Sequence, residues 1–169
     1  MVKGAKRVRK LDRIDLSILD ELQNNARITN HDLSSRVNLS PTPCLERVRK
    51  LERDGYIRNF RAILNARKLG IGLTVFVEIS LTRTGPDVFA QFKEAAIDVP
   101  EVQECHLVSG NFDYLIKARV ADVAHYRSLL GETILALPGV NDSRSYIVME
   151  TVKEGQLLSM KSVTEHGIG

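Results

Sequence analysis

The sequence predicts an α+β protein with two parts: a mostly α-helical, N-terminal winged helix-turn-helix and a C-terminal ferredoxin-like βαββαβ domain with an antiparallel sheet. Three observations lead to this prediction. Apolar residues recur at helical spacing up to residue 54, and a strand-helix-strand pattern then occurs twice after residue 74. The charge also changes sign, because residues 1–61 hold 14 Lys and Arg against 8 Asp and Glu, whereas residues 62–169 hold 10 against 13. This asymmetry predicts a polyanion as the partner of the basic part.

The composition is typical of a globular protein, since 43% of the 169 residues are hydrophobic and 27% are charged. No run approaches the roughly 18 apolar residues that a membrane helix needs, and the basic first ten residues lack the apolar stretch of a signal peptide. We therefore expect a cytoplasmic protein without membrane contacts. Cys44 and Cys105 have no Cys-x-x-Cys spacing, and both are expected to be reduced core residues.

Three helices are expected in the first part. The first spans about residues 11–25, with one apolar face and two acidic residues in its first turn. The second is short and has Thr29 or Asn30 as its N-cap. The third begins at Ser40-Pro41, an N-cap residue followed by a proline at a position where a missing amide hydrogen costs nothing, and it ends before Gly55.

The third helix is expected to have an apolar inner face and a polar, largely basic outer face. The inner face would consist of Cys44, Leu45, Val48 and Leu51. A short helix, a tight turn and a later helix with an exposed cationic face form the layout of a helix-turn-helix that reads the major groove of DNA. The candidate contacts to phosphates or guanines are Arg47, Arg49, Lys50 and Arg53, and the candidate contacts to bases are Ser40, Thr42 and Glu46, with Pro43 on the same face.

The segments before and after the three helices also carry basic residues. Residues 1–10 form a basic arm, and residues 56–64 alternate as a strand or hairpin arm would, which predicts a wing carrying Arg58 and Arg61. The domain is thus expected over residues 11–64, followed by a linker at 65–73. The alternative is that the charged face of the third helix is merely solvated. The spacing, the Ser-Pro start and the basic excess together favour nucleic-acid binding.

The second part, expected over residues 74–153, contains a duplicated βαβ unit. Residues 99–102, Val-Pro-Glu-Val, recur as residues 137–140, Leu-Pro-Gly-Val. Both helices of such a fold lie on one face of the sheet, so that an apolar opposite face would need a second copy as its cover. The tail after residue 153 shows no pattern. Strands are expected at 74–81, 102–108, 114–120 and 143–150, and helices at 86–96 and 122–135.

A polar loop of Ser109, Gly110, Asn111 and Asp113 lies between the two repeats. The residues alone favour a hairpin turn, for which Gly110-Asn111 is suitable chemistry. The other interpretation is an amino-acid site, in which amide hydrogens hold the carboxylate of the ligand and Asp113 holds its ammonium group.

Catalytic and cofactor motifs are missing from the sequence. It has no G-x-S-x-G, Walker A or H-E-x-x-H motif and no dinucleotide-binding fingerprint, and its four histidines are scattered, so neither catalytic residues nor a metal site nor a cofactor is expected. One alternative is an amino-acid-binding regulatory subunit of a metabolic enzyme, because ferredoxin-like domains occur in such subunits. RNA binding is a weaker alternative, since the aromatic strand motif lacks its basic residue and this segment is acidic.

Four stretches resemble the Lrp/AsnC, or feast/famine, family of bacterial and archaeal transcriptional regulators. The resemblance covers nearly all of residues 11–152. The stretches are Leu11-Asp-Arg-Ile-Asp15, Leu39-Ser-Pro-Thr-Pro-Cys-Leu-Glu-Arg-Val-Arg49, Glu104-Cys-His-Leu-Val-Ser-Gly110 with Phe112-Asp-Tyr114, and Leu129-Leu-Gly-Glu-Thr133 with Leu137-Pro-Gly-Val-Asn-Asp142.

The resemblance implies a winged helix-turn-helix joined to a regulator-of-amino-acid-metabolism (RAM) domain. Such a nucleoid-associated activator or repressor binds double-stranded DNA, assembles from homodimers into octamers or hexadecamers, and responds to a free amino acid bound between dimers. Leucine is the expected effector, and another amino acid is the alternative. The DNA-reading unit would span residues 30–49, which adds Asn30 to the candidates. The effector pocket would draw on Leu107, Val108, Ser109, Gly110, Asn111, Asp113, Leu135, Tyr146, Ile147 and Val148, with Asn111 at a position where the family pattern leads us to expect an aspartate.

Overall fold

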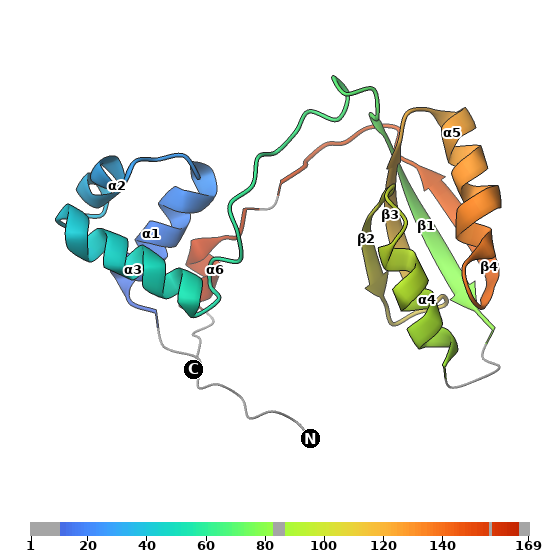
Figure 1. Cartoon of the computed structure of the whole chain (residues 1–169), viewed down its shortest axis with the longest axis horizontal. Helices are drawn as coiled ribbons and strands as arrows, with labels where there is room; N and C mark the ends of the chain where they lie inside the picture. Colours follow the sequence, from blue (N-terminus) through green and yellow to red (C-terminus); the bar gives the residue numbers. More distant parts are fainter. Residues whose placement is uncertain (1–10, 83–86, 156, 166–169) are drawn as a thin grey trace. The chain divides into compact units, whose positions relative to one another are not determined.

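The computed structural model describes residues 11–82, 87–155 and 157–165, and the chain divides into two compact units. One unit comprises the chain up to Ile63 together with the segment from Glu154 onward, and the other comprises Leu64–Lys153 (Figure 1). The expected basic arm at residues 1–10 lies outside the described residues. No helix in the described ranges is both long and apolar enough to cross a membrane.

The first unit is built on three helices, α1 (Arg13–Asn24), α2 (Asn30–Arg36) and α3 (Pro41–Arg53). The expected N-cap of α2 is found at Thr29, whereas the capping box at the start of α1 was not expected. Asp12 and Asp15 form a reciprocal capping box at α1, and the Thr29 hydroxyl accepts a hydrogen bond from the Asp32 amide at 3.1 Å. The apolar faces of the helices meet in one core of Ile18, Leu22, Leu33, Val37, Cys44 and Leu51.

Two residues with positive φ set the path of the chain around α3. Asn38 has φ 54° in the turn between α2 and α3, and Gly55 has φ 81° just after α3. Asparagine tolerates this left-handed region better than most residues, and glycine adopts it without strain. The turn and the end of the helix are therefore specified locally.

The expected strand at residues 56–64 does not form within the described residues of one chain. The segment is irregular and largely exposed, including Phe60, Ile63 and Leu64. A strand is stable only when its backbone groups find a partner, and alternation in the sequence supplies no such partner. The wing is thus an extended segment here and not a hairpin.

A short helix in the tail, α6 (Met160–Glu165), was not expected from the sequence. The segment before it is held on α1, because the Gln23 side-chain amide donates to the Leu158 carbonyl and accepts from the Leu158 amide, both at 2.9 Å. Six residues are too few to display a helical period, which explains why the pattern was not visible.

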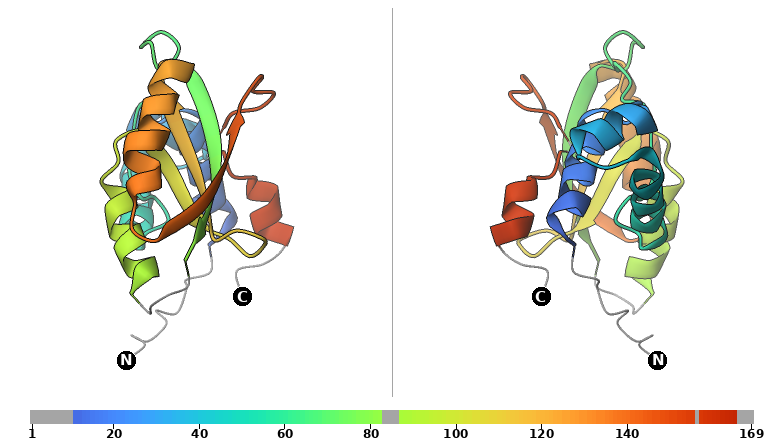
Figure 2. Two further views of the ribbon diagram at one scale, coloured as in Figure 1. Left: turned by 90° about the vertical axis from the view of Figure 1, so that its right-hand side faces the viewer. Right: turned by 90° about the vertical axis from the view of Figure 1, so that its left-hand side faces the viewer.

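The second unit is a four-stranded antiparallel sheet with the order β2-β3-β1-β4, the order of a ferredoxin-like fold. Figure 2 shows in side view that α4 and α5 lie on the same face of the sheet. The elements are β1 (Leu73–Leu81), α4 (Val88–Ile97), β2 (Val102–Leu107), β3 (Tyr114–Val120), α5 (Val123–Ser128) and β4 (Val140–Ile147), and α5 continues as a π-turn at Leu129–Thr133 and a 3-10 turn at Ile134–Ala136.

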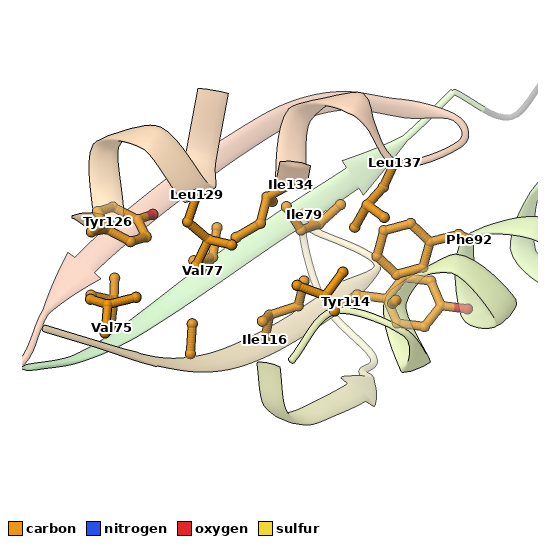
Figure 3. Close-up of a cluster of buried hydrophobic side chains, with 14 of the residues drawn as sticks. Val75, Val77, Ile79, Phe92, Tyr114, Ile116, Tyr126, Leu129, Ile134 and Leu137 are labelled. Carbon is orange, nitrogen blue, oxygen red and sulfur yellow. The ribbon is translucent and has the colours of Figure 1, made fainter. Parts of the chain in front are cut away.

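The core of this unit lies between the sheet and its two helices (Figure 3). Alternate residues of β1 and β3 point into it, as the period of a strand requires. Its members include Val75, Val77, Ile79, Phe92, Tyr114, Ile116, Tyr126, Leu129, Ile134 and Leu137.

Strand β4 begins and ends three residues earlier than expected. It begins early because Gly139, with φ 76°, turns the chain directly into the strand, and a Cβ at this position would lie 2.2 Å from Val88 Cγ1. It ends at Ile147 because this residue pairs with Val75, close to where β1 begins.

Among the described residues of this unit, no helix covers the opposite face of the sheet, and this face is only partly apolar. Half-buried Phe76 and Leu115 lie on β1 and β3. On the flanks, Lys117 Nζ lies 3.0 Å from Glu104 Oε1, and the Tyr146 hydroxyl donates to Glu78 Oε1 at 3.0 Å. A partner for this face must therefore match charges as well as apolar surface.

Candidate functional site

One exposed stripe runs along α3. Thr42, Glu46, Arg49 and Arg53 are spaced by four, three and four residues, so they lie on one side of the helix, and all four are exposed. Lys50 and Pro43 are also exposed beside this stripe. The opposite side carries Cys44 and Leu51, both fully buried. The stripe therefore projects away from the core of its unit, with two arginines and a lysine available to a polyanion.

Arg47 does not belong to this surface. Its guanidinium Nη1 lies 2.7 Å from Asp12 Oδ2 and 2.8 Å from Asp15 Oδ1. The Arg47 side chain is 30% exposed, whereas that of Asp15 is completely buried. The expectation that Arg47 flanks the outer face is wrong in this respect, because Arg47 follows Cys44 by three residues and precedes Leu51 by four, which puts it on the buried side.

The acidic start of α1 explains this orientation. Burial alone would raise the pKa of Asp12, but the hydrogen bond from the Asp15 amide and the Arg47 guanidinium outweigh burial and hold this pKa below its ordinary value. The hydrogen bonds to Asp12 and Asp15 also raise the pKa of Arg47. Arg47 therefore stays charged and holds the first turn of α1 against the middle of α3. The two aspartates are visible in the sequence, but their role as partners of Arg47 is not.

The prediction for Leu45 is also wrong, because this residue is exposed although a position on the inner face was expected. It lies beside the exposed stripe, where an apolar side chain is available to contact a thymine methyl group.

Two polar candidates lie where α2 meets α3. Asn30 Nδ2 donates to the Pro41 carbonyl at 2.8 Å, so Asn30 ties the start of α2 to the first turn of α3. Ser40 is exposed and makes no side-chain capping bond. Asn30 thus links the two helices, while the Ser40 hydroxyl remains at the exposed N-terminal end of α3.

In the second unit, Asp113 anchors the loop between β2 and β3. Its carboxylate accepts a hydrogen bond from the Leu81 amide at 2.8 Å, and its own amide donates to the Ile79 carbonyl at 2.9 Å. The Val108 amide donates to the Asp113 carbonyl at 3.0 Å, which closes the loop. Ser109, Gly110 and Asn111 are exposed. The loop is thus a hairpin connection held against the end of β1, as the structural interpretation of its residues expected.

Leu107 lies at the start of this loop, where it pairs with Tyr114, whereas the other effector candidates lie elsewhere. Tyr146 and Ile147 pair with Phe76 and Val75, and the Val148 amide donates to the Thr74 carbonyl, near the start of β1. Asp113 lies near the end of β1, several residues away, and a strand advances about 3.3 Å per residue, which gives a separation of roughly 15 Å. Leu135 is exposed in the 3-10 turn on the helix side. Within one chain, the ten candidates do not line one pocket.

The two cysteines differ. Cys44 is buried in the core of the first unit, as expected, but Cys105 is exposed on the edge strand β2, so the expectation of a core position is wrong for it. An edge strand has a neighbouring strand on one side only, so its side chains are covered less than those of a central strand. The periodicity of a single segment does not reveal whether a strand lies at the edge.

Residues 74–158 match the Lrp/AsnC ligand binding domain, and residues 11–58 match a winged helix-turn-helix DNA-binding domain. The leucine-responsive regulatory proteins of Serratia marcescens and Escherichia coli (strain K12) are each 60% identical to this chain over 163 residues, which are 96% of this chain and 99% of theirs.

Two solved structures resemble the chain over nearly their whole length. A transcriptional regulator from Neisseria meningitidis in complex with L-Met has a TM-score of 0.87 and 35% identity, with 90% of this chain and 99% of that one covered. An AsnC family transcriptional regulator from Agrobacterium tumefaciens has a TM-score of 0.86 and 34% identity over the same shares. The match therefore includes both units.

Proposed function

Because the chain belongs to the Lrp/AsnC family of transcriptional regulators, we propose that it binds double-stranded DNA through the outer stripe of α3 and that a free amino acid, bound by the second unit, controls this binding. Its relatives are regulators and not enzymes, so the alternatives of an enzyme subunit and an RNA-binding domain are set aside. The observation that carries the proposal is the exposed row of Thr42, Glu46, Arg49 and Arg53 on a helix whose other side is packed.

The side chains of this row suit two kinds of contact with DNA, those to phosphates and those to bases. Arg49, Arg53 and Lys50 carry positive charge for phosphates or guanine edges, and Thr42 and Glu46, near the start of the helix, offer groups for base edges. Glu46 is suited to accept a hydrogen bond from a cytosine amino group. One helix covers only a few base pairs, so we propose that two copies bind a two-fold symmetric site.

The uncovered face of the sheet supports a homodimer as the unit that binds. Its partly apolar centre and its flanking charges fit the same face of a second copy, in which each charged residue can meet an opposite charge. Assembly of dimers into octamers or hexadecamers is part of the same proposal. The separation of the effector candidates within one chain supports it, because residues from a neighbouring copy can bring the loop at 108–113 and the segment 146–148 together.

Leucine is the proposed effector, since relatives that share 60% of their residues with this chain are leucine-responsive regulatory proteins. L-methionine is the second candidate, because the Neisseria relative was solved as an L-Met complex at 35% identity. Both are unbranched at Cβ and similar in size, so a pocket for one can accept the other with a modest change in affinity.

The proposal is tested by selecting DNA sites from a random duplex pool with the full chain and measuring affinity by fluorescence anisotropy with and without each amino acid. Light scattering on the same samples reports the assembly. We expect a two-fold symmetric site and an affinity or assembly size that changes with leucine and, more weakly, with methionine. Alanine is the control ligand. Binding without a symmetric site, or a response to no amino acid, would refute the proposal.

A further inference from the structure

A groove lies between α4 and the edge strand β2, and Leu107 is the one proposed effector residue that lines it. It has a volume of about 430 Å³, which is within the range of small-molecule sites. Its mouth is apolar, because Ile97 is 80% exposed and Leu107 is 59% exposed. It is lined by Lys93, Ala96 and Ile97 of α4, by Val102, Gln103, Glu104, Cys105 and Leu107 of β2, and by Tyr114 of β3.

Tyr114, one of the residues that line this groove, carries a buried polar group without a partner among the described residues. Tyr114 is 2% exposed, and its hydroxyl has no hydrogen-bond partner among the described residues. Its ring packs against Phe92, with 4.5 Å between the ring centres, and in Figure 3 its oxygen points away from the apolar cluster. Leaving such a hydroxyl unsatisfied costs about 1–3 kcal/mol. The other buried tyrosine of this core, Tyr126, has Ser145 as its partner.

The groups around the groove are donors. Burial raises the pKa of the Tyr114 phenol, so this hydroxyl keeps its proton at neutral pH. Lys93 adds a positive charge on the α4 side. The two lining residues with acceptor side chains are engaged elsewhere, because Glu104 is bound by Lys117 at 3.0 Å and Gln103 accepts from Arg119 at 3.1 Å.

We propose that this groove is a second small-molecule site, which takes a small carboxylate with a branched apolar tail and no ammonium group, such as a branched-chain 2-oxo acid. The Tyr114 hydroxyl donates to the carboxylate, and Lys93 stabilises its charge. The tail packs on Ile97, Val102 and Leu107. An amino acid is disfavoured, because the groove has no uncommitted carboxylate side chain for an ammonium group.

The site is separate from the proposed effector site in residues and in chemistry. Only Leu107 is shared between them, and the effector site must hold an ammonium group whereas this groove must not. A regulator with both sites would sense an amino acid and the 2-oxo acid that carries a keto group in place of its amino group. Either site can fail its test without affecting the other.

The test is isothermal titration calorimetry of the full chain with 4-methyl-2-oxopentanoate. We expect binding by the wild type and a loss of about tenfold or more in Tyr114→Phe, which corresponds to one hydrogen bond to a charged group. Lys93→Gln should lose several fold, with a weaker dependence on salt. Tyr126→Phe is the matched control, since it removes the partnered hydroxyl of the same core, and it should bind as the wild type does.

Ligand controls separate this site from the effector site. The uncharged ketone 4-methylpentan-2-one should bind at least tenfold more weakly than 4-methyl-2-oxopentanoate, and Tyr114→Phe should keep the leucine response of DNA binding. No binding of 4-methyl-2-oxopentanoate by the wild type, or equal binding by the wild type and both groove variants, would overturn the proposal. Lys93 is exposed, so its variant remains informative if Tyr114→Phe is poorly folded.

Discussion

Most of the candidate DNA-binding residues lie on one helix, α3, whereas most of the candidate effector residues lie at two ends of one sheet. The first set is complete in a single chain, because consecutive turns of α3 bring Thr42, Glu46, Arg49 and Arg53 together. The second set is not, because the register of β4 on β1 holds Tyr146 and Ile147 far from Asp113. A site built on one helix needs only its helix, whereas a site distributed over a sheet needs another copy to complete it.

Arg47 and Arg49 lie about half a helical turn apart on α3, and the largest difference in stability is expected between their alanine variants. Arg47→Ala removes a cationic partner of the buried Asp15 carboxylate, and the loss of one partner of a buried ion pair costs about 3 kcal/mol or more. Because Arg47 is partly exposed, we expect the lower end of that range. Arg49→Ala, at an exposed position, should change stability by less than about 0.5 kcal/mol.

Urea unfolding of the full chain, followed by circular dichroism, checks this difference. Equal midpoints for the two variants would show that the ion pair of Arg47 contributes no net stability. In that event Arg47 would again be a candidate for direct contact with DNA.

A second prediction concerns affinity for DNA. Arg53→Ala should weaken binding by about tenfold, since one lost contact of an arginine costs about 1–3 kcal/mol. Glu52→Gln, which changes the neighbouring exposed residue, is the control and should leave affinity within about threefold of the wild type. Fluorescence anisotropy with a selected site measures both. If Arg53→Ala bound as well as the wild type did, the row on α3 would not be the DNA-binding surface.

Sequence reasoning succeeded wherever the information is local. The three helices, the N-cap at Thr29, the βαββαβ order and the family are confirmed. Predictions failed where the position of a residue depends on contacts with residues far away in the sequence. Arg47 looked like a surface cation until the position of Asp15 was known, residues 56–64 alternate but have no strand to pair with, and Cys105 lies on an edge that periodicity does not reveal.

A third prediction concerns the loop at Asp113. Asp113→Ala leaves the part-buried amide of Leu81 without its acceptor, so we expect a loss of about 1 kcal/mol in stability as well as a weaker amino-acid response. Ser109→Ala, in the exposed part of the loop, should change the response without changing stability. Thermal unfolding with and without leucine separates the two effects. An unchanged response in Asp113→Ala would remove this loop from the effector site.

The smallest expected effect is a dependence on pH. The pKa of Asp12 is below its ordinary value of 3.8 in the folded chain, so its stabilising contribution is present above that value and is lost as the pH falls below it. In Asp12→Asn, the free energy of unfolding should therefore fall less steeply as the pH is lowered. Near neutral pH, its slope against pH should be nearly the same as in the wild type. Urea midpoints between pH 3 and pH 6 measure this. An acid limb that is the same in wild type and variant would contradict the pairing of Asp12 with Arg47.

The dependence of DNA affinity on salt tests the central claim most directly. For the wild type, log K should fall steeply and linearly with log salt concentration, because cations on the protein displace counterions from phosphates. The slope should decrease by about two in Arg49→Ala combined with Arg53→Ala, and it should not change in Glu52→Gln. A nearly flat slope for the wild type, or the same steep slope in the double variant, would contradict DNA binding by the outer stripe of α3.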